Sequence, residues 1–141
     1  MAIKITVSRK NNMPAPKATA IIIRDNKVLL VRVDWRPYAM PGANIQDPRD
    51  PAIANISRKV SEVLDLDPIS ATRLESCDVT DGRYAHKAVL LGVDPRDHPV
   101  VMTGVTEFIW WDRVTPITCY NHVAEILEKY DQINEETNTE H

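Results

Sequence analysis

The sequence has few of the residues that stabilise a fold through disulfides or a zinc ion. Two cysteines, Cys77 and Cys119, occur among 141 residues, and they lie far apart in the chain. Such an isolated pair shows neither the spacing of a disulfide framework nor that of a zinc site. We therefore expect a hydrophobic core to hold the chain together, and a chain of this length can build one in a single domain.

Long apolar runs and a large excess of charge of one sign are also missing. The longest apolar segments, such as residues 18–23, are far too short to cross a bilayer. Residues 1–10 lack the apolar centre of a signal peptide. The formal net charge is -3, whereas general binders of nucleic acids or membrane surfaces are usually basic. We expect a cytoplasmic protein that binds neither duplex nucleic acid nor membranes.

The most informative stretch is residues 40–66, MPGANIQDPRDPAIANISRKVSEVLDL, in which a Pro-Gly turn and a polar loop precede an amphipathic helix. Asp50 is expected to cap the helix and Pro51 to be its first residue. The helix is expected to end near Asp65, ahead of Asp67-Pro68. Apolar residues recur at three- and four-residue steps and predict one buried stripe, made of Ile53, Ile56, Val60 and Leu64.

Alternating and β-branched segments predict the strands around this helix. Two-residue turns are expected at Asp25-Asn26 and at Asp81-Gly82. Prolines and polar residues predict loops over 11–17, 34–41 and 94–99. The predicted strands are residues 2–9, 18–24, 27–33, 71–79, 84–93 and 106–111, with a short one at 100–102.

A second amphipathic helix is predicted over residues 118–133, with Thr118 as its cap. Its inward side chains are expected to be Val123, Ile126, Leu127 and Tyr130. Strands followed by a helix, more strands and a closing helix predict an α/β fold with helices on both faces of a sheet. The domain is expected to cover residues 1–133 and to be followed by a polar, frayed tail over 134–141.

The order of these segments resembles that of the Nudix hydrolases, over residues 17–130. The resemblance implies a Nudix-type α/β/α sandwich with a mixed β-sheet. It also implies cleavage of a diphosphate linked to a nucleoside, with Mg²⁺ or Mn²⁺ as cofactor and a nucleotide-like small molecule as partner. The segments that carry it are ATAIIIRDNKVLLVRV, WRPYAMPGA, RKVSEVLDL, TEFIWWD and HVAEILEKY.

The metal-binding part of the motif departs from the family pattern. Hydrolysis of this kind needs several carboxylate oxygens in one place, and carboxylates at positions i, i+3 and i+4 of a helix supply them. Here these positions hold Lys59, Glu62 and Val63. Ala43 and Asp65 replace two glycines of the motif, and one inserted residue brings Asp50 to the place of an upstream glutamate. One of the three helix ligands remains.

The resemblance assigns roles to individual side chains, and each has an ordinary structural alternative. Glu62, Glu107 and Arg58 could be solvated surface groups, and Asp50 could be a helix cap. The aromatic residues Trp35 and Tyr38 could pack in the core or in a loop. His86 and His98 show no partner at metal or catalytic spacing. The expected catalytic residues are Glu62, Glu107 and Arg58, the metal ligands Glu62, Asp50 and Glu107, and the substrate-binding residues Lys59, Trp35, Tyr38 and Arg36.

Two functions stay open at this point, and the first is favoured. In the first, the chain is expected to be a weakly active or inactive hydrolase-like protein for a nucleoside-diphosphate-linked substrate, or a module that has lost hydrolysis and binds a nucleotide-like molecule or a protein in the old cleft, with no metal. Alternatively it is an active Mg²⁺-dependent pyrophosphohydrolase in which Asp47 or Asp65 compensates for the missing ligands. Selectivity would reside in the loops 34–38 and 78–83. Formation of a homodimer through the edge strand 2–9 is likewise open.

Overall fold

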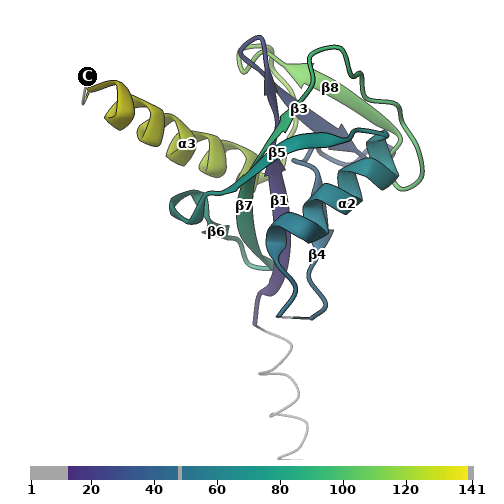
Figure 1. Cartoon of the computed structure of the whole chain (residues 1–141), viewed down its shortest axis with the longest axis horizontal. Helices are drawn as coiled ribbons and strands as arrows, with labels where there is room; N and C mark the ends of the chain where they lie inside the picture. The colour runs from purple at the N-terminus through teal and green to yellow at the C-terminus, as the bar shows by residue number, and fades with distance from the viewer. Residues whose placement is uncertain (1–12, 48, 140–141) are drawn as a thin grey trace, which may run out of the picture.

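The computed structural model describes residues 13–47 and 49–139, with side chains up to residue 135. Figure 1 shows the strands at the centre, with α2 lying across them and α3 extending away at the yellow, C-terminal end. The predicted strand 2–9 lies outside the described residues. The elements are β1 (Ala15–Ile21), β2 (Ile23–Arg24), β3 (Lys27–Arg32), β4 (Gly42–Asn44), α2 (Ala52–Leu64), β5 (Pro68–Arg73), the 3₁₀ turn η1 (Glu75–Cys77), β6 (Val79–Thr80), β7 (Tyr84–Val93), β8 (Glu107–Trp111) and α3 (Asn121–Thr139).

The strands form two sheets. The larger has the order β4-β1-β7-β5, with β6 also paired to β7, and the smaller has the order β2-β3-β8. The pairing of β1 with β7 is parallel, while the other pairings between named strands are antiparallel. The predicted mixed sheet is therefore confirmed.

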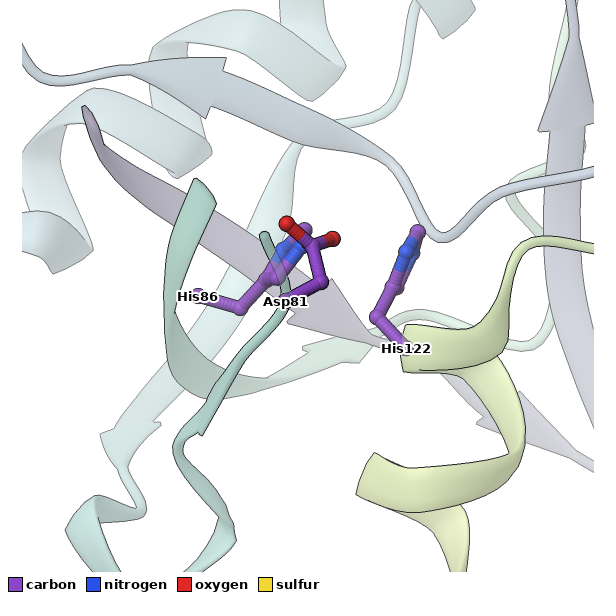
Figure 2. Close-up of side chains that lie close together, drawn as sticks. All are labelled: Asp81, His86 and His122. Carbon is purple, nitrogen blue, oxygen red and sulfur yellow. The ribbon is translucent and has the colours of Figure 1, made fainter. Parts of the chain in front are cut away.

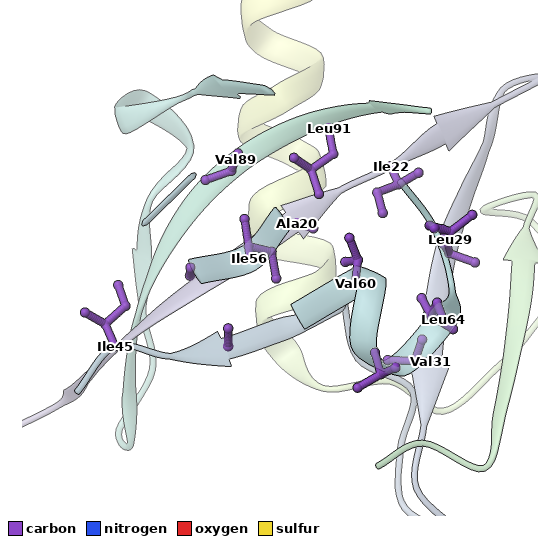
Figure 3. Packing of buried hydrophobic residues seen from close by; sticks show 14 residues of the cluster. Ala20, Ile22, Leu29, Val31, Ile45, Ile56, Val60, Leu64, Val89 and Leu91 are labelled. Carbon is purple, nitrogen blue, oxygen red and sulfur yellow. The ribbon is translucent and has the colours of Figure 1, made fainter. Parts of the chain in front are cut away.

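Two hydrophobic cores lie on opposite faces of the strands. Side chains alternate between the faces of a strand, so consecutive residues belong to different cores. In β1 and the residue after it, Ala20 and Ile22 face the α2 core, whereas Ile21 faces the α3 core. In β7, Val89 and Leu91 face α2, as Figure 3 shows for the labelled residues of that core. Two helices covering opposite faces confirm the α/β/α sandwich.

Helix α2 follows the predicted apolar stripe, but its first turn differs from the prediction. Ile56, Val60 and Leu64 are fully buried. Pro51 rather than Asp50 is the N-cap, because its ψ of 136° is extended and no side chain caps the helix. Asp50 lies outside the helix, so its predicted capping role is wrong. The helix ends at Asp65, in the left-handed conformation at φ 54°, as expected.

Two predicted strands are interrupted in the structure. The segment 18–24 divides into β1 and β2, which lie in different sheets. The segment 71–79 is broken by η1, which is followed by Asp78 in an extended conformation. Its carboxylate accepts hydrogen bonds from the Arg73 guanidinium at 2.6 and 2.7 Å and from the Ala88 N–H at 2.9 Å. Side-chain bonds therefore replace part of the backbone pairing expected there.

The predicted strand 100–102 and the start of the second helix are also wrong. Val100 and Met102 donate backbone N–H groups to the carbonyls of Leu64 and Val63, so this segment closes the C-terminus of α2 instead of joining a sheet. Thr118 does not cap α3, because the helix begins at Asn121, and the Thr118 carbonyl instead accepts the N–H of Tyr38 at 2.9 Å. Helix α3 begins later and continues beyond the expected end at residue 133.

The turn at Asp25-Asn26 and the inward face of α3 are confirmed. Both turn residues have positive φ, 52° and 63°, which matches the twist of a tight hairpin between β2 and β3. Strand β1 begins at Ala15, inside the segment expected to be a loop. None of the helices in the described ranges is long and apolar enough to cross a bilayer.

The buried stripe of α2 should dominate the stability of the domain. Replacing Ile56, which is fully buried, with alanine removes its contacts with the sheet and leaves a cavity. We expect the free energy of unfolding to fall by about 2–5 kcal/mol. Urea denaturation followed by circular dichroism measures this change. Ser61→Ala on the exposed face of the same helix should change it by about 0.5 kcal/mol or less, and equal effects of the two substitutions would contradict this packing.

Candidate functional site

A cleft of about 670 Å³ opens beside the N-terminal half of β1. Its walls come from the loop between β3 and β4, from α2, from the turn between β6 and β7, from the segment before β8 and from the start of α3. Lys17 of β1 and His86 of β7 are paired in the strand register and both line it. The cleft is therefore positioned by the central strand pair and bordered by loops.

Cationic side chains dominate the described lining of this cleft. Asp81 is the one carboxylate residue among these lining residues. Magnesium requires several oxygen ligands, mostly carboxylates, whereas phosphates are recognised by lysine and arginine. The lining therefore suits an anion better than a Mg²⁺ ion. The cations are Lys17, Arg32, Arg36, Lys59 and Arg83.

Lys17 shows how crowded these cations are. Its Nζ lies 4.4 Å from the centre of the Tyr84 ring, in a cation–π contact. Burial lowers the pKa of Lys17, the Asp81 carboxylate raises it, and Lys59 and Arg83 lower it again, with a net decrease. An anion bound among these groups would relieve their mutual repulsion.

A cluster of Asp81, His86 and His122 lines the same cleft (Figure 2). Asp81 Oδ2 lies 3.0 Å from His86 Nε2, and Thr19 Oγ1 lies 2.9 Å from His86 Nδ1. The rings of His86 and His122 are stacked, with centroids 4.3 Å apart and an angle of 22° between their planes. Both histidines are buried, and the bonds to Asp81 and Thr19 replace the water that the His86 ring loses on folding, as the Met40 N–H does for His122.

The surroundings of this cluster set the protonation of Asp81 and His122. Burial acts to raise the pKa of Asp81, but the N–H groups of Tyr84 and Arg83 and the His86 ring outweigh it and bring the pKa to about 2. Burial, then the charges of His86 and Lys17, lower the pKa of His122 to about 3. At neutral pH the carboxylate is therefore ionised and the His122 ring is neutral.

Two of the predicted site residues line the cleft, namely Lys59 and Arg36. Glu62 and Arg58 lie on the exposed side of α2, where Arg58 Nε is 4.0 Å from Glu62 Oε1, and neither belongs to the described lining. Asp50 is exposed and likewise outside it. The structure thus brings together two predicted substrate-binding residues and separates them from these predicted catalytic and metal-binding groups.

The other predicted residues, Glu107, Tyr38 and Trp35, lie outside the described lining of the cleft. Glu107 forms an ion pair with the Arg32 guanidinium, which lies 4.8 Å from the centre of the buried Tyr38 ring. Trp35 is 86% exposed and extends away from the core.

Val63, which the resemblance places at a ligand position of the motif, belongs to the hydrophobic core. It is 5% exposed and belongs to the cluster beneath α2. A Cβ atom added to Gly104, whose φ is 102°, would lie 3.4 Å from a Val63 methyl group. The helix face that would carry carboxylates in the motif is therefore packed at this position.

The expectation that His86 has no partner is wrong, and the cluster around it was missed. Asp81 reaches His86 across the turn between β6 and β7, five positions away, which a search for helical or short metal motifs does not detect. His122 arrives from the other end of the chain. One signal was present in the sequence: His86 occupies an inward position of an apolar strand, and a buried imidazole requires a partner.

Comparison with known proteins identifies the fold. No family model matches the chain, and no curated protein matches it either. Solved structures do match, among them a protein from Chromobacterium violaceum assigned to the Nudix hydrolase family. It is 21% identical, with a TM-score of 0.71, over 85% of this chain and 78% of that one.

Two further matches come from proteins with named ligands or activities. An Ap4A hydrolase from C. elegans has a TM-score of 0.67 and 16% identity over 86% of this chain and 98% of its own. The Nudix domain of NrtR from Shewanella oneidensis, solved with ADP-ribose, has a TM-score of 0.64 and 17% identity over 94% and 99%. The chain therefore has the Nudix fold, and the resemblance in the sequence is confirmed at that level.

The buried hydrogen bond between Thr19 and His86 should be measurable as stability. Thr19→Val keeps the shape of the side chain but leaves His86 Nδ1 without a partner, which we expect to cost about 1–3 kcal/mol of unfolding free energy. Thr19→Ser, which keeps the hydroxyl and loses one methyl group, should cost about 1 kcal/mol or less. Urea titration at neutral pH compares them, and a valine variant as stable as the serine variant would show that the bond contributes nothing.

Proposed function

We propose that this chain is a Nudix-fold module that binds a nucleoside-diphosphate-like anion and that hydrolyses it weakly or not at all. The observation that carries the proposal is the lining of the cleft, in which five cationic side chains accompany a single carboxylate residue among the described residues. A diphosphate carries its charge on oxygens that accept hydrogen bonds from lysine and arginine. It therefore meets the complementary charge without a metal ion.

The described residues of the helix face do not fit a Mg²⁺ ion. Lys59 lines the cleft where the motif would place a carboxylate, and Val63 is buried. A unit charge pair about 4 Å apart interacts by about 4 kcal/mol near a protein surface, so exchanging a carboxylate for an ammonium turns such an attraction into a repulsion. Glu62 alone, on the solvent side of α2, offers too few oxygens.

The nucleoside part of the ligand is supported by aromatic side chains and by the neighbouring folds. Tyr84 and Tyr120 line the cleft, and Tyr120 is 43% exposed, which leaves a ring face available for stacking with a base. The Nudix domain of NrtR was solved with ADP-ribose, and another match is a UDP-X diphosphatase. ADP-ribose is therefore the first ligand to test.

Binding should depend on the cations of the cleft and not on a divalent metal. We expect calorimetry in EDTA to detect ADP-ribose, and Lys59→Gln to weaken its affinity roughly tenfold, the effect of losing one charge-assisted hydrogen bond. Arg58→Gln is the matched control, since it removes the same charge from the adjacent, exposed position outside the described lining. Equal losses in both variants would indicate nonspecific attraction, and absence of binding would refute the proposal.

Hydrolysis should be absent or very slow. We expect ADP-ribose, Ap4A, a UDP-sugar and nucleoside triphosphates to be cleaved no faster with Mg²⁺ or Mn²⁺ than in EDTA, because the helix face supplies one carboxylate. Chromatography of the products at high protein concentration measures this, with a Nudix hydrolase that retains all its carboxylates as positive control. Metal-dependent turnover that disappears in Glu62→Gln would instead establish the alternative, an active pyrophosphohydrolase using Glu62, Glu107 and Asp50.

A further inference from the structure

Three side chains from different parts of the chain converge at the floor of the cleft. Asp81 comes from the turn before β7, His86 from β7 itself, and His122 from the first turn of α3. One potential ligand atom from each lies within 4.8 Å of those of the other two (Figure 2). Two imidazoles and one carboxylate are a donor set found at catalytic zinc sites, in which three protein ligands leave one position open.

Other contacts hold these three side chains in place. Thr19 Oγ1 is 2.9 Å from His86 Nδ1, and the N–H groups of Arg83 and Tyr84 donate to Asp81 Oδ1 at 2.8 and 2.6 Å. The Met40 N–H donates to His122 Nε2 at 3.3 Å. Hydrogen bonds of this kind orient the ligands of metal sites. His86 Nε2 and Asp81 Oδ2 are bonded to each other at 3.0 Å, so a metal ion would take the place of that hydrogen bond, while the Met40 bond leaves Nδ1 as the other ring nitrogen of His122.

We propose that Asp81, His86 and His122 bind one divalent transition-metal ion of the Zn²⁺ class, with an open coordination position that faces the cleft. Imidazole nitrogens favour zinc and its neighbours in the periodic table, whereas Mg²⁺ takes oxygen ligands. This site is separate from the helix face that lacks carboxylates, and it goes beyond the proposed anion binding. Neither proposal requires the other.

Metal binding requires two local changes. The ion would take the place of the hydrogen bond between His86 Nε2 and Asp81 Oδ2, which are 3.0 Å apart, with the ring proton carried by Nδ1 beside Thr19 Oγ1, and His122 would turn out of its stacked position over His86. The nearby cation Lys17 opposes a further positive charge, while the Asp81 carboxylate favours it. A water molecule or an anion from the cleft would occupy the open position.

The test uses the full chain, freed of metal with EDTA and titrated with Co²⁺ in the absence of any nucleotide. We expect one Co²⁺ per chain, with the visible absorption of a four- or five-coordinate ion, displacement by Zn²⁺ and no effect of Mg²⁺. Asp81→Asn can keep the turn hydrogen bonds through its amide oxygen and should weaken Co²⁺ binding at least tenfold. His98→Gln, in an exposed loop, is the matched control and should bind as the unmodified chain does.

A second measurement needs no variant and so does not depend on the folding of one. Zn²⁺ should shift the imidazole nitrogen resonances of His86 and His122 in the unmodified chain, and leave those of His98 unchanged. Absence of a visible Co²⁺ spectrum, or equal binding by Asp81→Asn and the unmodified chain, would overturn the proposal. Resonance shifts at His98 alone would overturn it as well. Because no nucleotide is present, a negative result leaves the anion-binding proposal untouched.

Discussion

The parallel pairing of β1 with β7 is the contact on which the rest of the molecule depends. It joins an early strand to one that follows both α2 and β5, and it fixes Lys17 beside His86 and Thr19 beside Ala88. Because both faces of these strands are covered, a shift by one residue would exchange the two cores and expose apolar side chains. The same register that builds the cores also places a lysine and a buried histidine side by side at the cleft.

The position of helix α2 depends on its buried side and its C-terminus. Its buried stripe and its closure by Val100 and Met102 depend on packing and on backbone hydrogen bonds. Neither requires a carboxylate on the opposite face, so Lys59 can project into the cleft at no cost to the core. Val63, one turn further along the helix, contributes its side chain to the core. The position of the helix is therefore independent of the chemistry on its surface.

The sequence predicts the layers of this fold because the periodicity of the apolar residues reports burial directly. Both helices, the Asp25-Asn26 turn and the strand over 106–111 follow from local patterns. Local patterns gave wrong predictions where a residue distant in the sequence forms hydrogen bonds with the segment. Asp78 ends a strand by binding Arg73 and the Ala88 N–H, and the segment 100–102 pairs with the end of a helix instead of a strand. These contacts are visible only once the chain has folded.

The candidate site likewise contains residues that the sequence predicts and residues that it does not predict. Lys59 and Arg36 could be placed in the cleft because a known motif fixes their positions relative to the helix and the preceding loop. The cluster of Asp81, His86 and His122 has no such motif, since its members come from a turn, a strand and a helix start. Only the β7 pairing and the packing of α3 bring them together.

The cleft combines two kinds of side chain, because cations and a cluster of two imidazoles and one carboxylate lie next to each other in its lining. Here lysines and arginines line the cleft, while ionised Asp81 and the buried imidazoles of His86 and His122 share its floor. Burying such groups is unfavourable unless they are paired or bind a ligand. Hydrogen bonds meet this requirement here, because Asp81 and His86 pair with each other, Thr19 with His86 and the Met40 N–H with His122. The charge of the lining and the nitrogen atoms of the cluster are what support the two binding proposals.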